Sequence, residues 1–386
     1  MLRTKDATAV QITLGLGKTV GGGEYTALIV NECLNELGYK VKLICKQHPD
    51  LSKYKIAFDI ERLGFDDVKI FKYPKLPKIF KLYHYLIYPI ITPKIPANLY
   101  FNTSADSHPF VIPLNAIIHK LPVIYYVTAI PLTPPYFTKK MKKEVYKNNI
   151  VTNVLKTCYY DLFRKISKKL WSNIVAHFIA CSNFVASQVD EALGVQSKIL
   201  YTPVDIGPYE WKGESKENYA VVMGRTVPSK NYEVAISACK EANVKLVMLL
   251  AIQDQKYYNK IVSFIKKEEM DQNVKILINA PLKERAEILK RAKVFIHCRV
   301  EAGAKAVREA MAAGCVPVVP HIGGQSEFVP REYTYSNQEE LPQKILYAMN
   351  VSTAERQEFV NMSKKHDKTE FKAKLKQIIT EIVSNR

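Results

Sequence analysis

Short apolar runs alternate with amphipathic segments along most of the chain. In the first half, an apolar run at 10–14 is followed by a glycine-rich loop, a segment of helical periodicity at 24–37 and a second apolar run at 41–45. This order predicts a strand, a helix that ends with Gly38 as its C-cap, and a parallel strand. Further strand-like runs in this half lie at 68–71, 98–101, 123–127 and 178–181.

The second half repeats the alternation more regularly. Strand-like runs lie at 219–223, 244–251, 274–278, 294–298 and 316–320, and helix-like segments lie between them at 232–242, 255–269, 282–292 and 304–313. Such alternation predicts a parallel sheet with right-handed crossovers, so each half is expected to be a doubly wound α/β domain. The turn-rich segment 201–216 is the expected boundary, and 370–383 is expected to form a C-terminal helix.

Composition fits an ordinary globular protein in all respects except charge. The chain has 386 residues, 47% hydrophobic and 24% charged, which excludes intrinsic disorder and allows two or three domains. Its 56 Lys and Arg oppose 37 Asp and Glu, and this formal charge of +19 predicts attraction to an anionic partner.

Cysteine usage and hydropathy predict a cytoplasmic protein. The seven cysteines are scattered without a CxxC pair, so we expect reduced core residues and no structural zinc site. The first residues lack the apolar core of a signal peptide. The most hydrophobic stretch, 79–101, is interrupted by prolines and charges and is not expected to span a membrane.

The strongest motif follows the apolar run 294–298. Glu301 lies in a short loop with Gly303, and Glu309 lies in the second turn of the expected helix, with seven residues between the two glutamates. Amides near Ala304 and Lys305 would form the helix N-terminus, where phosphate binds well. Taken alone, two such glutamates are more often a loop charge and a solvated helix residue, but the strand–loop–helix context favours a functional site.

The segment resembles the E-x7-E region of the family 4 retaining glycosyltransferases. In that family the first glutamate contacts the donor sugar and the second binds the nucleotide ribose, which implies these roles for Glu301 and Glu309. Gly323, Gly324 and Glu327 also follow the family's pattern. The resemblance is clear over 219–330 and weaker over 10–45, 123–131 and 178–206.

The resemblance implies the GT-B architecture, an α/β fold of two Rossmann-like doubly wound domains facing each other across a cleft. Residues 1–205 would form the acceptor domain, with a basic, aromatic, membrane-facing region. Residues 206–365 would form the nucleotide-sugar donor domain. Residues 366–386 would form a helix that crosses back to the first domain.

Two cations follow the apolar run 219–223. Gly224 and Arg225 come at its end and Lys230 five residues later, a spacing that resembles the family's GR-x4-K motif. Arginine offers a bidentate fork and lysine a point charge, and both suit a diphosphate. Without the resemblance, Arg225 and Lys230 are as easily interpreted as two surface cations of a basic chain.

The glycine loop after the first strand invites a P-loop interpretation, which fails on spacing. A Walker A motif needs glycine where the chain has Ile12, and the GxGxxG pattern lacks its third glycine. Gly21, Gly22 and Gly23 remain, immediately before a helix, where backbone amides can approach a phosphate or sugar closely. Their sequence GGGE resembles the N-terminal loop of the family, especially of mannosyltransferases that extend lipid-linked oligosaccharides on the cytosolic membrane face.

The chain departs from the family pattern at two places. Thr128 follows the run 123–127 where the related mannosyltransferases often carry a histidine, and this affects the acceptor side. The sequence Gly303-Ala304-Lys305 stands where the family usually has Gly-Phe-Gly. Backbone amides can still bind phosphate there, and Lys305 is expected to add a phosphate contact or to narrow the site.

Basic and aromatic residues gather in two stretches, 68–98 and 136–171. This pattern suits an anionic membrane surface or single-stranded nucleic acid, and a solvated basic surface is the alternative. No nucleic-acid module signature is present, which favours the membrane.

We therefore expect a retaining hexosyltransferase of mannose or glucose type with a GDP- or UDP-hexose donor and a lipid-linked or glycan acceptor, peripheral on the cytoplasmic face of a membrane. No DxD pair is evident and the resemblance implies no obligatory metal or other cofactor. The alternatives are an epimerase-type GT-B enzyme and a non-catalytic protein that binds anionic lipid or nucleic acid.

Overall fold

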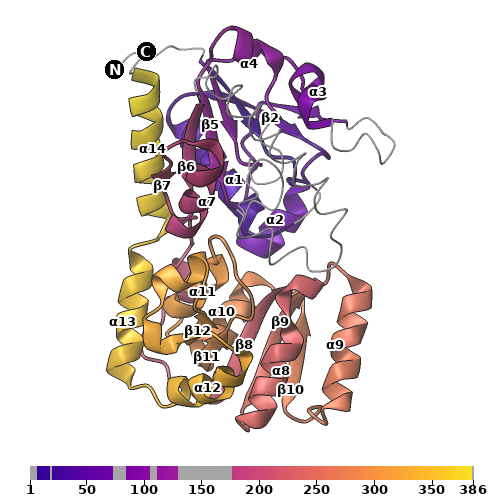
Figure 1. Ribbon diagram of the computed structural model, residues 1–386, viewed down its shortest axis with the longest axis vertical. Coiled ribbons are helices and arrows are strands. Elements are labelled where there is room, and N and C mark those ends of the chain that lie inside the picture. Colours follow the sequence, from indigo (N-terminus) through magenta and orange to yellow (C-terminus); the bar gives the residue numbers. More distant parts are fainter. Residues whose placement is uncertain (1–6, 18–19, 73–83, 105–110, 129–175, 385–386) are drawn as a thin grey trace. The chain divides into compact units, whose positions relative to one another are not determined.

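The computed structural model describes residues 7–17, 20–72, 84–104, 111–128 and 176–384. The chain divides into two compact units. Unit 1 consists of Met1–Tyr54, Ile60–Thr202 and Phe371–Arg386, and unit 2 of Lys55–Asp59 and Pro203–Glu370. Each unit is built on one parallel sheet covered by helices (Figure 1).

Unit 1 contains a seven-stranded sheet in the order β3-β2-β1-β4-β5-β6-β7, in which every neighbouring pair is parallel. Its strands are β1 (Thr8–Ile12), β2 (Lys40–Cys45), β3 (Asp67–Ile70), β4 (Leu99–Asn102), β5 (Val123–Val127), β6 (Ala176–Ala180) and β7 (Lys198–Ile199). The helices of this part of the chain are α1 (Gly22–Glu36), α2 (Leu51–Phe58), α3 (His84–Ile91), α4 (Leu114–Ile118) and α7 (Asn183–Leu193). Strands β4 and β5 are buried at every position, as expected for a sheet covered on both faces.

The C-terminal helix α14 (Lys368–Ser384) closes unit 1 and contains the predicted helical segment 370–383. Its Phe371 ring lies 6.0 Å from the Tyr126 ring, centroid to centroid. Lys372 and Lys376 both form ion pairs with Glu36 of α1, the second at 2.9 Å. An aromatic contact with β5 and a shared carboxylate on α1 thus fasten the C-terminal helix to the rest of unit 1.

Unit 2 contains a six-stranded sheet in the order β10-β9-β8-β11-β12-β13, again parallel throughout. Its strands are β8 (Glu217–Arg225), β9 (Lys245–Ala251), β10 (Val274–Ile278), β11 (Ala292–Ile296), β12 (Val316–Pro320) and β13 (Thr334–Tyr335). Its helices are α8 (Tyr232–Glu241), α9 (Gln255–Lys267), α10 (Leu282–Arg291), α11 (Lys305–Ala312), α12 (Leu341–Met349) and α13 (Thr353–Lys364).

The two sheets share one strand pattern, and this confirms the expectation of two doubly wound α/β domains. In each sheet the first strand of the unit lies beside the fourth, β1 beside β4 and β8 beside β11, and the strand order reverses at that point. Doubly wound sheets bind ligands at the carboxyl ends of these two strands. The loops after β8 and β11 therefore lie at the expected position for a ligand.

Most predicted elements of unit 2 are confirmed within two residues, and the predicted strands at 274–278 and 316–320 agree with β10 and β12. The prediction for Gly38 was wrong by one position. Leu37 is the C-cap of α1, and Gly38 follows it with φ of +89°, a left-handed conformation that suits glycine. The helices that were not predicted are α2, α3, α4, α7, α12 and α13.

Six of the seven cysteines have described positions, and none of the six forms a disulfide. Five are buried and one, Cys298, is partly exposed; the six are Cys33, Cys45, Cys181, Cys239, Cys298 and Cys315. Cys158 lies outside the described residues. Within the parts of the chain that the structure describes, no helix combines the length and apolarity needed to cross a membrane.

The described part of the basic stretch 68–98 places two of its aromatic side chains in the core. Phe71 is 2% exposed and Tyr88 is fully buried, and their rings meet edge to face at 5.8 Å. These two rings therefore do not face a membrane, because they supply the apolar packing of unit 1. Residues 73–83 and the whole stretch 136–171 lie outside the described residues.

Gly314, which follows α11, allows the cost of a steric clash to be separated from the cost of a strained backbone. Gly314 has φ of +70°, and a Cβ there would lie 2.7 Å from the Trp211 ring. We predict that Gly314→Ala lowers the free energy of unfolding by about 1–2 kcal/mol for the left-handed backbone and by roughly 1–3 kcal/mol more for the clash. Urea unfolding of the full chain measures the sum of these two losses.

Gly213 is the matched control, because its φ is +97° and a Cβ there would have no other atom within 4 Å. Gly213→Ala should show the backbone part of the loss alone. Equal losses in the two variants would contradict the packing role of Gly314.

Candidate functional site

Strand β8 ends in a glycine that makes room for a lysine. Gly224 has φ of +150°, and a Cβ there would lie 3.0 Å from the Tyr232 hydroxyl and 3.2 Å from Cε of Lys230. The short 3-10 turn Pro228–Lys230 brings Lys230 back over this glycine. A side chain at position 224 would therefore displace Lys230, which explains why glycine precedes Arg225.

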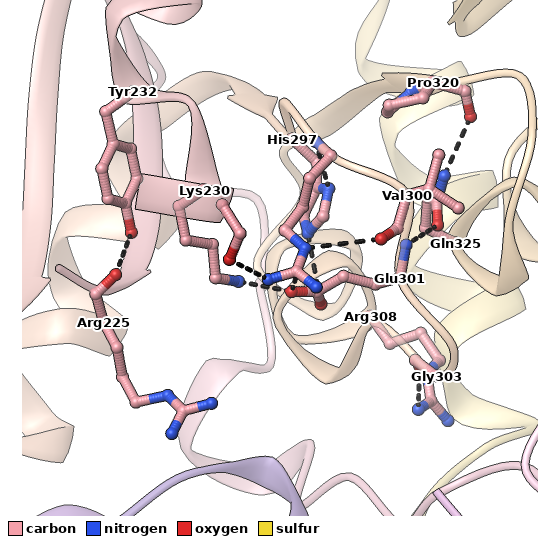
Figure 2. A network of polar contacts seen from close by, with 12 residues as sticks. Arg225, Lys230, Tyr232, His297, Val300, Glu301, Gly303, Arg308, Pro320 and Gln325 are labelled. Carbon is pink, nitrogen blue, oxygen red and sulfur yellow. Dashed lines mark hydrogen bonds and ion pairs between the residues drawn. The ribbon is translucent and has the colours of Figure 1, made fainter. Parts of the chain in front are cut away.

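Lys230 contacts Glu301, which follows the neighbouring strand β11 (Figure 2). Lys230 Nζ lies 2.6 Å from Glu301 Oε1, and the two side chains are 14% and 22% exposed. His297 Nε2 lies 3.4 Å from Glu301 Oε2, and Arg299 Nε lies 3.6 Å from Oε1. The structure thus brings together two of the three predicted catalytic residues and adds His297 and Arg299, which sequence reasoning missed.

Glu301 is ionised in these surroundings. Burial alone would raise the pKa of its carboxyl, but the charge of Lys230, followed by the contacts of His297, outweighs burial and holds that pKa well below its ordinary value. A carboxylate that stays charged at neutral pH can accept hydrogen bonds from sugar hydroxyls.

A buried glutamine holds the loop that carries Glu301. Gln325 is fully buried, and its Oε1 accepts a 2.8 Å hydrogen bond from the Glu301 backbone N–H. Its Nε2 donates to the backbone carbonyls of Pro320 and Ile322. Gly323 must lack a side chain, because a Cβ would lie 2.3 Å from Gln325 Oε1. The glycine pair was visible in the sequence, whereas the role of the glutamine next to it was missed.

Helix α11 begins at Lys305, and its N-cap is Ala304 in a left-handed conformation with φ of +38° and ψ of +56°. This conformation costs a non-glycine residue about 1–2 kcal/mol. The first amides of any α-helix have no acceptor within the helix and are available to an anion. The predicted phosphate-binding amides therefore lie at a helix N-terminus, as expected.

Glu309 faces Lys305 across the first turn of α11. Lys305 Nζ forms an ion pair with Glu309 Oε1, and the two side chains are 14% and 7% exposed. Burial raises the pKa of Glu309, but Lys305, followed by Arg285 and the Tyr209 hydroxyl, reverses this effect and lowers it. Each of the two predicted glutamates is therefore an ionised carboxylate with its own lysine.

Arg308 supports the same loop and was not predicted. Its side chain is fully buried, its Nη2 donates a 2.9 Å hydrogen bond to the Gly303 carbonyl, and its guanidinium carbon lies 4.6 Å from the centroid of the Phe328 ring. The only sequence signal for it is its position directly before Glu309. Its hydrogen bond fixes the orientation of the Gly303 peptide before α11.

Arg225 stands apart from these pairs. Its backbone carbonyl accepts a 3.3 Å hydrogen bond from the Tyr232 hydroxyl, but its guanidinium points away from the contact between Lys230 and Glu301 (Figure 2). The structure therefore places Arg225 at the end of β8, as predicted, without joining it to the Lys230–Glu301 pair.

Gly21, Gly22 and Gly23 form the start of α1. Gly21 is its N-cap in an extended conformation without a side-chain cap, and Gly22 is its first residue. A Cβ at Gly23 would meet no atom within 4 Å, so packing among the described residues does not require glycine there. These residues lie at an uncapped helix N-terminus that follows β1.

Among the residues with described positions, no group of three His, Cys, Asp or Glu side chains is arranged to hold a metal ion. The side chains next to the two carboxylates are those of lysine, arginine and histidine.

Residues 209–366 match the family described as Glycosyl transferases group 1, a region that includes Arg225, Lys230, Glu301 and Glu309. No protein of curated function is similar to the chain in sequence.

Solved structures extend the likeness to almost the whole chain. HepE of Anabaena, determined with UDP and glucose, is 15% identical with a TM-score of 0.69, over 97% of this chain and 100% of HepE. Sucrose-phosphate synthase of Thermosynechococcus elongatus is 12% identical with a TM-score of 0.71, over 98% and 100%. The pneumococcal O-GlcNAc transferase GtfA, determined with UDP and GlcNAc, is 12% identical with a TM-score of 0.65, over 98% and 99%.

The fold is that of the GT-B glycosyltransferases. The expected fold class is thereby confirmed.

The lowered pKa of Glu301 predicts how its contribution to stability depends on pH. Because the folded-state pKa lies below the unfolded value, this contribution is fully present above about pH 4.5 and is lost as the pH falls through the folded-state pKa. We expect Glu301→Gln to reduce the free energy of unfolding by roughly 1–3 kcal/mol at pH 7, because the adjacent cations lose their acceptor.

The difference between wild type and Glu301→Gln should shrink as the pH is lowered from 6 to 3, measured by urea unfolding of the full chain. Glu287→Gln, on the surface of α10 with a side chain 55% exposed, is the control and should change little at any pH. A difference that is constant across this range would contradict the lowered pKa.

Proposed function

We propose that the protein is a retaining glycosyltransferase that moves a hexose, of mannose or glucose type, from a nucleoside-diphosphate donor to a lipid-linked or glycan acceptor. The observation that carries this proposal is the pair of ionised carboxylates, Glu301 and Glu309, set on one strand–loop–helix turn with a lysine beside each. This turn lies within the residues that match the group 1 glycosyl transferases.

The donor would bind mainly to residues 206–365, with each part of the molecule met by matching chemistry. Arg225, Lys230 and the first amides of α11 would hold the diphosphate, which is where charge develops as the sugar leaves. Glu309 would accept hydrogen bonds from the ribose hydroxyls, and Glu301 from the donor sugar. Gly224 and Gly303 would let the backbone and Lys230 reach these positions.

The glycine run 21–23 of unit 1 is a further proposed point of contact with the donor. Amides at Gly21, Gly22 and Gly23 lie at an uncapped helix N-terminus and can approach a phosphate or sugar closely. The open space around a Cβ at Gly23 supports this role, because packing among the described residues does not explain the glycine.

The reaction needs few protein groups. The bond between the anomeric carbon and the diphosphate oxygen breaks, the acceptor oxygen bonds to that carbon on the same face, and the acceptor's proton passes to the leaving phosphate. Arg225 and Lys230 would stabilise the negative charge on that phosphate and thereby lower the barrier. Glu301 would orient the sugar, so that departure and attack occur on one face.

The base of the donor is proposed as uracil or guanine. HepE and GtfA were determined with UDP, which favours uracil, while the resemblance of the GGGE loop to mannosyltransferases favours guanine. Both donors therefore belong in the first test. We propose no obligatory metal or other cofactor, since cations and helix amides of the chain can neutralise the diphosphate.

A membrane location is proposed from the charge of the chain. The stretches 68–98 and 136–171 are rich in Lys and Arg, and an anionic cytoplasmic leaflet attracts such segments. A lipid-linked acceptor would be met at that surface. Thr128, partly exposed directly after β5, stands where the related mannosyltransferases often carry histidine and is the first described residue to vary on the acceptor side.

Donor binding should stabilise the protein against heat. We expect UDP or GDP, or a corresponding nucleotide sugar, at roughly 100 times its dissociation constant to add about 2.7 kcal/mol of stability. Arg225→Ala and Glu309→Gln should each lose most of this stabilisation and at least tenfold in transfer rate without unfolding, because each removes one charged contact to the donor.

The controls are Arg291→Ala and Glu287→Gln, which remove the same charges from the exposed face of α10 and should bind like wild type. Incubation with the donor alone separates the enzyme classes, since an epimerase would consume the donor without an acceptor. Full transfer activity in both Arg225→Ala and Glu309→Gln would overturn the proposed function.

A further inference from the structure

Lys305 occupies a position that works against the electrostatics of its own helix. It is the first residue of α11, and the N-terminus of a helix carries a partial positive charge that disfavours a cation. The order of the pair, with lysine four residues before glutamate, is also the weaker of the two orientations on a helix. A lysine at this position therefore needs an anion beside it.

Glu309 is that anion in the structure. The ion pair between Lys305 Nζ and Glu309 Oε1 neutralises both side chains, and both are almost buried. The carboxylate that is proposed to bind the ribose is thus held by the lysine at the helix N-terminus where the phosphate is proposed to bind. Lys305 and the ribose hydroxyls would compete for the same carboxylate.

The charged form of Glu309 does not depend on Lys305 alone. Arg285 and the Tyr209 hydroxyl also favour its charged form. Arg285 is tied to the backbone, since its Nη1 donates a 3.1 Å hydrogen bond to the carbonyl of Ala280. If Lys305 moved away, Glu309 would still have a fixed cation and a hydroxyl beside it, and its charge would persist.

We propose that Lys305 exchanges its partner when a nucleoside diphosphate binds. Lys305 leaves Glu309 and pairs with the diphosphate at the N-terminus of α11, and this releases the Glu309 carboxylate for the ribose. This inference rests on the proposed function and adds a coupling to it. A phosphate draws the lysine away, and the freed carboxylate then binds the sugar of the nucleotide. A nucleoside without phosphate cannot release Glu309 and is bound poorly.

The proposed exchange predicts that Lys305→Ala affects the affinities for UDP and for uridine differently. In Lys305→Ala the diphosphate loses a charged contact, so UDP should bind about tenfold more weakly than to wild type. Uridine should bind as well as to wild type or up to tenfold more tightly, because Glu309 is already free. The preference for UDP over uridine should therefore fall at least tenfold.

Isothermal titration calorimetry of the full chain with UDP and uridine measures this preference, and GDP with guanosine is run in parallel. Lys305→Arg keeps the charge and should retain most of the preference. Lys283→Ala removes an exposed lysine from the first turn of α10 and is the matched control, for which no change is expected.

Three results would overturn the inference. If Lys305→Ala weakens the nucleoside and the diphosphate by the same factor, Lys305 has a structural role only. If neither affinity changes, it has no role in binding. If wild type binds none of the four ligands, the proposed function fails as well, whereas the first two results leave that function intact.

Discussion

The ion pair between Lys230 and Glu301 joins the two loops on which the whole site depends. Strands β8 and β11 are parallel neighbours at the point where the strand order reverses, so their carboxyl ends deliver both residues to one edge. Gly224 leaves room for the lysine, and Gln325 anchors the backbone of the glutamate. The pair lets a nearly buried carboxylate stay charged, because burial without a cation would favour its neutral form.

Helix α11 shows how this domain distributes charge along one short element. Lys216 Nζ donates to the carbonyl of Ala313 at 2.6 Å and Arg356 Nη1 to that of Gly314 at 3.3 Å, and a cation at a helix C-terminus is favourable. Burial lowers the pKa of Lys216 to about 8, which shows how closely it is enclosed. Lys305 at the opposite end is unfavourable by the same rule. The C-terminal cations stabilise the fold, and the N-terminal one is suited to an incoming anion.

Sequence patterns were sufficient for the alternation of strands and helices over 219–320 and for the residues of the E-x7-E and GR-x4-K motifs, because spacing along the chain fixes both. They were insufficient for His297, Gln325 and Arg308, whose roles depend on neighbours brought close by folding. The left-handed Ala304 was equally invisible, since alanine carries no signal for positive φ. Aromatic residues such as Tyr88 suggested a membrane surface from composition, whereas burial decides their role.

The excess positive charge of the chain is separate from the charges that form the donor site. Residues 68–98 contain six Lys and no Asp or Glu, and residues 136–171 contain ten Lys and Arg against two Asp and Glu, so these stretches hold 14 of the 19 excess charges. At the site itself, Lys230 and Lys305 are each matched by a carboxylate. Donor recognition would therefore depend on local pairing and respond weakly to salt, whereas attraction to an anionic surface would depend on the net excess of positive charge and respond strongly. The dependence of each on ionic strength distinguishes the two.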